Sequence, residues 1–184
     1  MSDEALAVIA DGMGVEPAAL LAVRDVESNG QAFDPMTLRP IILFEPHVFS
    51  RLTRNQFDDI MPNVSYRVWK TRPYPPSQSE RWIQMTYAYQ LDPAAALQAA
   101  SWGMFQIMGF HWKRCGCGSA FDFANRMATD QAEQVKLLIA WLDSNGKAAL
   151  KAKNWLRFAT LYNGTGQAEA YAAKLKAAYE KRKA

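Results

Sequence analysis

The sequence offers few groups that could cross-link the chain or bind a metal ion. It contains two cysteines, Cys115 and Cys117, and two histidines, His47 and His111. A disulfide between cysteines separated by one residue would strain the bridge geometry, and these four residues do not follow a zinc-binding spacing. We therefore predict free thiols in a glycine-rich turn, structural histidines, and neither a metal ion nor another cofactor.

Long apolar segments are also missing. No apolar run approaches the roughly 20 residues that a helix needs to cross a bilayer. Residues 1–4 include two acidic side chains and no basic one, whereas a secretory signal peptide begins with basic residues. We expect a protein without an export signal, so that action outside the cytoplasm would depend on release by another protein.

The rest of the composition is that of a globular domain. The chain has 184 residues, of which 49% are hydrophobic and 21% charged, and this length supports one sizeable core. The sequence contains no internal repeat, low-complexity tract or linker. Residues 1–184 are therefore predicted to form a single domain.

Charge is distributed unevenly along the chain. Residues 147–184 carry nine basic and two acidic side chains, a net charge of +7, whereas the chain as a whole carries +3. A basic segment of this kind favours an anionic partner such as nucleic acid, a membrane surface or an acidic polymer. A solvated helix face would show the same pattern, so charge alone does not identify a partner.

Helical patterns cover most of the chain. Residues 31–76 are the exception, because they hold seven of the nine prolines and two β-prone runs, at residues 41–44 and 66–69. A capping-box pattern at residues 53–56 predicts one short helix within this region. Elsewhere, caps, first-turn prolines and glycine stops predict helices over residues 3–11, 17–28, 77–90, 92–100, 119–128, 129–144, 154–163 and from 167 onward. We predict a mainly α fold of the α+β type, a helical domain with a cleft beside a small irregular, β-prone lobe.

One carboxyl group has an unusual position. Glu27 falls in the last turn of the helix that is predicted to close at Ser28-Asn29-Gly30. The negative end of the helix dipole disfavours a second negative charge there, so the pKa of Glu27 should be raised. The small residues after it leave room for a ligand. A glutamate near a helix end is usually only solvated, so a functional role requires further residues around it.

Two later stretches supply such residues. The first, Ser101-Trp102-Gly103-Met104-Phe105-Gln106, places a hydroxyl, a glycine and an amide among bulky apolar side chains. A core helix would explain the apolar residues but not Gly103 or Gln106, and an amide in apolar surroundings must find a hydrogen-bond partner. The second, Tyr162-Asn163-Gly164, would by itself be no more than a helix stop.

In order along the chain, these stretches resemble three signatures of the goose-type lysozyme and soluble lytic transglycosylase superfamily. The matching residues are Glu27-Ser28, Ser101-x-Gly103-x-x-Gln106 and Tyr162-Asn163. The wider sequence is more similar still to the N-acetylmuramidase domain of phage endolysins. That similarity includes Phe44-Glu45-x-His47-x-Phe49 and Trp155-x-x-Phe158-Ala159-x-x-Tyr162-Asn163-Gly164.

The resemblance implies a lysozyme, a glycoside hydrolase that cleaves the β-1,4 bond between N-acetylmuramic acid and N-acetylglucosamine in peptidoglycan. Glu27 matches the general acid that protonates the glycosidic oxygen. Tyr162 matches the residue that lies against this acid in the cleft. The remaining matches, Ser101, Gln106 and Asn163, are expected to contact sugar or to shape the cleft floor, and Gly103 would let backbone approach the glycan. Trp102 is not part of the match, but from its place inside the second motif we expect it to stack on a sugar face.

A second carboxylate is less well defined. Glu45 is our first candidate, because it follows the apolar residues 41–44, where an idle charge would be costly. Asp34 is the second candidate. A lytic transglycosylase would need neither of them, because a hydroxyl of the substrate attacks and leaves an anhydro sugar.

The biological setting follows from the same resemblance. We expect a monomeric phage endolysin, without a separate wall-binding module, that stays in the host cytoplasm until release and then degrades periplasmic peptidoglycan. The basic C-terminal helix would contact the anionic envelope weakly, and we expect no nucleic-acid partner. Two alternatives stay open: a lytic transglycosylase, and a non-catalytic basic helical module that binds glycan or nucleic acid.

Overall fold

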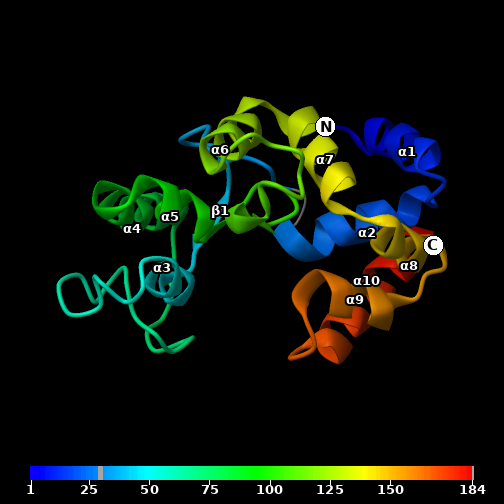
Figure 1. Ribbon diagram of the computed structural model, residues 1–184. Helices are drawn as coiled ribbons and strands as arrows, with labels where there is room; N and C mark the ends of the chain where they lie inside the picture. The colour runs from blue at the N-terminus through cyan, green and yellow to red at the C-terminus, as the bar shows by residue number, and fades with distance from the viewer. Residues whose placement is uncertain (29–30, 184) are drawn as a thin grey trace. The chain divides into compact units, whose positions relative to one another are not determined.

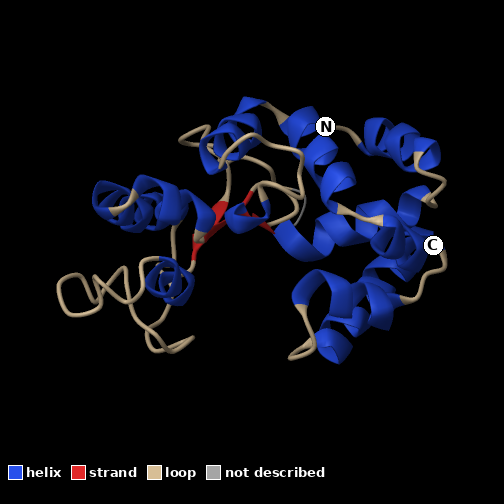
Figure 2. Cartoon of the chain, viewed as in Figure 1, coloured by secondary structure: helices blue, strands red, loops and turns tan. Residues whose placement is uncertain are grey.

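The computed structural model describes residues 1–28 and 31–183. The chain divides into two compact units, which we call the terminal unit, residues 1–30 and 142–184, and the central unit, residues 31–141. Helices make up most of the terminal unit, whereas the central unit combines helices with the strands and with long turns (Figure 2). The predicted mainly α fold with a small β-containing part is thus confirmed.

The terminal unit is built from helices alone within the described residues (Figure 1). Its helices are α1 (Asp3–Gly12), α2 (Pro17–Ser28), α8 (Ser144–Lys151), α9 (Trp155–Asn163) and α10 (Ala168–Lys183). Local signals open two of them as predicted. Pro17 is the first residue of α2, and the Asn154 side chain caps α9 by accepting from the Arg157 amide at 3.1 Å.

Helix α10 holds this unit together, because it packs on both α2 and α9. Its buried residues include Ala172, Leu175 and Tyr179, spaced by three or four along one face. Leu20 of α2 and Phe158 of α9 are likewise almost completely buried. The core of the terminal unit therefore joins segments from the two ends of the chain.

One helix boundary differs from its prediction. Asn145 and Gly146 were predicted to stop a helix, but α7 (Gln131–Trp141) already ends before them, and both residues lie in the first turn of α8. The Asp143 side chain accepts a hydrogen bond from the Gly146 amide at 2.7 Å. Asp143 thus acts as an N-cap, and the Asn-Gly pair that looks like a stop signal instead begins a helix.

The central unit combines helices with a three-stranded antiparallel sheet of order β1-β2-β3. Its elements are β1 (Ile42–Phe44), α3 (Pro46–Leu52), α4 (Gln78–Leu91), α5 (Pro93–Gln98), β2 (Ala100–Trp102), β3 (Ile107–Met108), the 3-10 helix η1 (Gly109–His111), α6 (Ala120–Thr129) and α7. Two predicted caps are confirmed. Ser77 and Glu80 form the capping box that opens α4, and Asp92 caps α5.

Residues 53–76 contain two predictions that are wrong. The capping-box pattern at residues 53–56 opens no helix, because α3 ends there and the Thr53 hydroxyl donates backward to the Phe49 carbonyl at 2.9 Å. Arg54 and Asn55 have positive φ angles, and the Asn55 amide donates to the Ser50 carbonyl, as in a helix C-cap. The β-prone residues 66–69 form turns and bends rather than a strand.

The two cysteines are buried free thiols, as predicted. Burial raises the pKa of the Cys115 thiol to about 12, so that this thiol stays protonated. His111 packs between Phe110 and Trp141, and burial lowers the pKa of its imidazole to about 4. Across the described residues, no helix combines the length and apolarity that a membrane span requires.

The turn between β2 and β3 depends on a glycine. Gly103 has a φ of +68°, and a Cβ atom there would lie 2.5 Å from Oε1 of Gln134. The Gln134 side chain is fully buried, accepts from the Met104 amide at 2.7 Å and donates to the Met127 carbonyl at 2.8 Å. Gly103 is therefore required both by its backbone conformation and by the buried amide that packs against it.

Replacing Gly103 by alanine should therefore destabilise the protein more than the backbone conformation alone would. We expect Gly103→Ala to lower the free energy of unfolding by about 3 kcal/mol, through left-handed strain and displacement of a buried amide. Gly116→Ala is the matched control, because Gly116 has a φ of +72° with nothing within 4 Å of the added carbon. The control should lose about 1 kcal/mol in urea unfolding. Equal losses in both variants would show that Gln134 imposes no constraint.

Candidate active site

Glu27 lies in the last turn of α2, as predicted, and its carboxyl group is partly buried. The Tyr171 hydroxyl, from α10, donates a hydrogen bond to Oε1 of Glu27. Burial raises the pKa of Glu27 to about 7, and the hydrogen bond from Tyr171 offsets part of that rise. The raised pKa was predicted, and its main cause is loss of solvent around the carboxyl group.

The tyrosine that donates to Glu27 belongs to a stack of aromatic rings. The ring of Tyr171 lies 6.1 Å from that of Tyr162, with 13° between the planes, and Tyr162 in turn stacks on Phe158 at 5.3 Å. The resemblance assigned the position against the acid to Tyr162. In the structure the hydrogen bond to Glu27 comes from Tyr171, which belongs to none of the three motifs.

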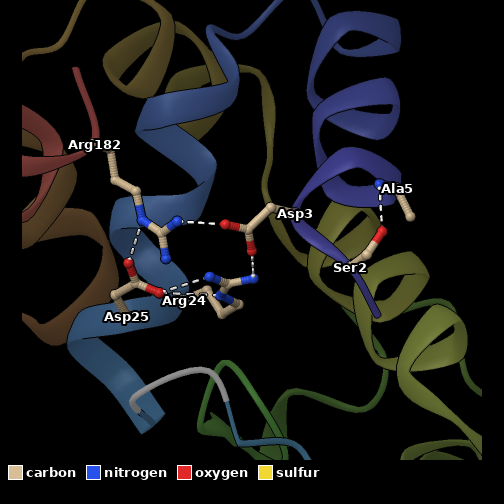
Figure 3. A network of polar contacts seen from close by, with 6 residues as sticks. All are labelled: Ser2, Asp3, Ala5, Arg24, Asp25 and Arg182. Carbon is tan, nitrogen blue, oxygen red and sulfur yellow. Dashed lines mark hydrogen bonds and ion pairs between the residues drawn. The ribbon is translucent and has the colours of Figure 1, made fainter. Parts of the chain in front are cut away.

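A network of charged side chains fixes the same helices (Figure 3). Arg24 of α2 is 7% exposed and binds Asp3 of α1 at 2.7 Å and its neighbour Asp25 at 2.9 Å. Arg182 of α10 binds Asp25 at 2.7 Å and also contacts Asp3. The hydrogen bonds from Arg24 and Arg182 keep the pKa of Asp3 low despite partial desolvation. The network connects the helix that carries Glu27 to the helix that carries Tyr171.

The network also uses part of the basic C-terminal charge. Arg182 is bound as described, and Lys183 lies 3.2 Å from a carboxylate oxygen of Glu16. Lys153 binds the other Glu16 oxygen at 3.1 Å. The +7 segment is therefore partly neutralised inside the terminal unit.

The second motif lies in the central unit, on the hairpin of β2 and β3. The Ser101 hydroxyl donates to Oε1 of Gln106 at 2.8 Å, and Nε2 of Gln106 donates to the Gly103 carbonyl at 2.9 Å. The predicted hydrogen-bond partner of Gln106 is therefore found within the motif itself. Gly103, which was expected to let backbone approach the glycan, has its observed role in packing against Gln134.

The position of Trp102 corrects its predicted role. Its side chain is 2% exposed, its indole nitrogen donates to the Leu97 carbonyl at 3.0 Å, and its ring meets Trp82 edge-on at 5.7 Å. A ring buried in this way has no free face for stacking on a sugar. Trp102 is therefore a core residue.

Glu45 follows β1 and occupies the N-cap position of α3 without capping it. Its Oε2 accepts a hydrogen bond from the Tyr74 hydroxyl at 2.7 Å and lies 3.2 Å from Nδ1 of His47. That nitrogen makes no hydrogen bond, and burial together with the charge of Arg51 lowers the pKa of His47, so we treat the imidazole as neutral. Burial raises the pKa of Glu45, opposed by the hydrogen bond from Tyr74.

Asp34 is occupied by its own turn. Its Oδ1 accepts from the Thr37 amide at 2.8 Å, the Thr37 hydroxyl at 2.9 Å and the Met36 amide at 3.2 Å. These hydrogen bonds lower the pKa of Asp34. The geometry assigns Asp34 a local structural role and leaves Glu45 as the stronger candidate for a second carboxylate.

The predicted site residues divide between the two units. Glu27 and Tyr162 belong to the terminal unit, and the central unit holds Asp34, Glu45, Ser101, Trp102, Gly103 and Gln106. Asn163 closes α9, but its side chain lies outside the described part of the structure, as do the Ser28 side chain and all of Asn29 and Gly30. Among residues 1–28 and 31–183, no three metal-binding side chains gather into a potential metal site.

Comparison with known proteins decides the family. The model of the N-acetylmuramidase family matches residues 16–183. The chain belongs to the N-acetylmuramidase family. The crystal structure of the Burkholderia AP3 phage endolysin is similar, with a TM-score of 0.85 and 36% sequence identity over 100% of this chain and 71% of that one. No curated protein sequence matches the chain.

Membership of the N-acetylmuramidase family favours the enzyme over a non-catalytic basic module. It also matches the chemistry at Glu27, since cleavage of a glycosidic bond needs a carboxylic acid that keeps its proton near neutral pH. Tyr171 is the residue that sequence reasoning missed. It lies four residues before Leu175 on α10, and a tyrosine that packs into a core usually finds a hydrogen-bond partner for its hydroxyl.

The raised pKa of Glu27 predicts how stability depends on pH. The folded protein holds this proton up to about pH 7, whereas the unfolded chain loses it near 4.5. The contribution of Glu27 to stability should therefore be greatest below pH 4.5 and fall by roughly 3 kcal/mol as the pH rises through 7. Glu27→Gln removes that contribution, so the variant should match the wild type at pH 4 and exceed its free energy of unfolding at pH 8. A difference that does not change between these pH values would contradict the raised pKa.

Proposed function

We propose that this N-acetylmuramidase is a phage endolysin that hydrolyses the β-1,4 bond between N-acetylmuramic acid and N-acetylglucosamine in peptidoglycan. The observation that carries the proposal is Glu27, a partly buried carboxyl group with a pKa of about 7 and a tyrosine hydroxyl on Oε1. The endolysin role is supported by the similarity to the Burkholderia AP3 phage endolysin.

In the proposed reaction Glu27 is the general acid. Its proton passes to the glycosidic oxygen as the bond from that oxygen to C1 of N-acetylmuramic acid breaks, and N-acetylglucosamine leaves with a free hydroxyl. Positive charge develops on the muramic ring in an oxocarbenium-like transition state. A water molecule then adds to C1 and releases its proton, which leaves a reducing end. Tyr171 donates to the Glu27 carboxylate that the proton transfer creates.

Glu45 is our candidate for the base that accepts the proton from water. The hydrogen bond from Tyr74 orients its carboxyl group and favours the ionised form that a base needs. Ser101 and Gln106 are proposed to shape the glycan-binding surface through the hairpin that they stabilise, and Asn163 stays a predicted sugar contact.

One observation favours a second candidate function. Burial raises the pKa of Glu45, which weakens it as a base in mildly acidic solution. A lytic transglycosylase would use the same acid without a second carboxylate, since the 6-hydroxyl of muramic acid attacks C1. Its product would be a 1,6-anhydromuramyl end.

Glu27→Gln should reduce turbidity clearing of peptidoglycan by at least about a thousandfold, because the amide cannot donate the proton. Product analysis of the wild type in water enriched in ¹⁸O separates the two reactions. Hydrolysis predicts reducing ends that carry one ¹⁸O atom, seen by mass spectrometry. Anhydromuramyl ends would establish the transglycosylase instead, and full clearing by Glu27→Gln would reject both.

Glu45→Gln tests the second carboxylate. We expect activity to fall by about a hundredfold or more if Glu45 is the base. Asp34→Asn is the matched control, because the amide oxygen can still accept from Thr37, and its activity should stay near that of the wild type. Near wild-type hydrolysis by Glu45→Gln would remove Glu45 from the mechanism.

The proposed setting is that of a monomer acting on periplasmic glycan strands after release from the host cytoplasm. Lysines on the exposed side of α10 would contribute a weak attraction to the anionic envelope. Those exposed lysines are Lys174, Lys176 and Lys181. Because Arg182 and Lys183 are held in ion pairs, we expect this attraction to be smaller than the +7 charge suggests.

A further inference from the structure

We propose that Tyr171 on α10, rather than Tyr162 of the third motif, is the positioning residue that holds Glu27 and sets the pH range of the reaction. Tyr162 has a supporting role, because its ring backs that of Tyr171. The inference deepens the proposed function and rests on the role of Glu27 as the acid.

Geometry fixes the phenol of Tyr171 from two directions. Helix α10 packs on α2, which carries Glu27, and the hydroxyl donates to Oε1 of that residue. The nearly parallel ring of Tyr162 packs against the ring of Tyr171. Tyr162 in turn stacks on Phe158, which is 1% exposed. The small side chains of Ala159, Ala168 and Ala172 form the cluster on which Tyr171 packs, so the ring lies close to the helices.

The chemistry of a phenol suits this position. A donor hydrogen bond favours the ionised form of a carboxyl group, whereas burial favours the protonated form. At Glu27 burial is the larger effect, so the residue keeps its proton near neutral pH. Once the proton has been transferred, the hydrogen bond from Tyr171 stabilises the carboxylate that remains. Burial and the nearby Glu27 charge raise the pKa of the Tyr171 hydroxyl, so it stays a donor.

Several charged groups on the surrounding helices bind one another rather than Glu27. On α1, α2 and α10, Asp3, Arg24, Asp25 and Arg182 bind one another (Figure 3). Glu16 binds Lys153 and Lys183. Helix α8 carries Lys147 and Lys151. Burial and Tyr171 are the influences that determine the protonation of Glu27 in the described structure.

The same helix offers a matched control. The hydroxyl of Tyr179, eight residues further along α10, donates to Oε2 of Glu16 at 2.8 Å. This is again a contact between a tyrosine and a carboxylate, and it helps to lower the pKa of Glu16 to about 2. Removing it should affect the stability of the terminal unit without changing the acid.

The experiment measures kcat and kcat/KM against pH for three variants that each lose one hydroxyl and keep the ring. In Tyr171→Phe the alkaline limb should move up by about one pH unit, the amount expected from losing one hydrogen bond to a charged group. The kcat at the optimum should fall about tenfold with KM nearly unchanged, because the acid is less well oriented. Tyr179→Phe should keep the wild-type alkaline limb, and any shift in Tyr162→Phe should be smaller than the shift in Tyr171→Phe.

A shift in Tyr162→Phe with none in Tyr171→Phe would overturn the inference, and so would equal shifts in Tyr171→Phe and Tyr179→Phe. Activity that survives Glu27→Gln would instead refute the proposed function itself. If Tyr171→Phe does not fold, NMR of the wild type with ¹³C-labelled tyrosine side chains provides the test. One phenolic carbon signal should titrate at the pH of the alkaline limb and persist in Tyr162→Phe, and its loss in that variant would contradict the inference.

Discussion

A carboxyl group withdrawn from water at the end of α2 is the constraint on which the terminal unit depends. Its charged form is costly there, and the tyrosine that donates to it, Tyr171, comes from the far end of the chain, on α10, with Tyr162 of α9 stacked on its ring. The ion pairs of Arg24 and Arg182 with Asp3 and Asp25 hold α1, α2 and α10 in place around it (Figure 3). At neutral pH the burial of Glu27 lowers the stability of the terminal unit, and the neighbouring contacts offset this loss. Active sites commonly show such an exchange of stability for reactivity.

The residues of the Ser-x-Gly-x-x-Gln motif, which is a signature of function, stabilise the local structure of the hairpin. Ser101, Gly103 and Gln106 satisfy one another's polar groups across a tight hairpin, and the buried Gln134 packs where any larger residue at 103 would collide. The resemblance to lysozymes therefore identifies a hairpin with a fixed shape. The buried Trp102 has no free face to offer a sugar.

Much of the fold follows from local sequence signals. The proline at the start of α2, the capping box of α4 and the Asn154 cap of α9 act through neighbouring residues, so the sequence contains what is needed to predict them. The turn after α3 was not predictable in this way. Thr53 was expected to cap a following helix, but its hydroxyl donates instead to the carbonyl of Phe49 in the preceding helix. The position of Glu27 in the last turn of α2 could also be predicted from neighbouring residues, but its hydrogen-bond partner, Tyr171, lies 144 residues away. A hydrogen bond at that separation depends on how α10 packs, which no motif encodes.

Direct titration of the Glu27 carboxyl group is the measurement that bears most closely on these conclusions. Infrared difference spectra between the wild type and Glu27→Gln, recorded from pH 4 to 9, isolate the C=O stretch of this one protonated acid. Its disappearance with a midpoint near pH 7 would show that the fold keeps the proton where the chemistry needs it. A midpoint near 4.5, the ordinary value for a glutamate, would show that Glu27 is ionised at neutral pH and does not act as the acid.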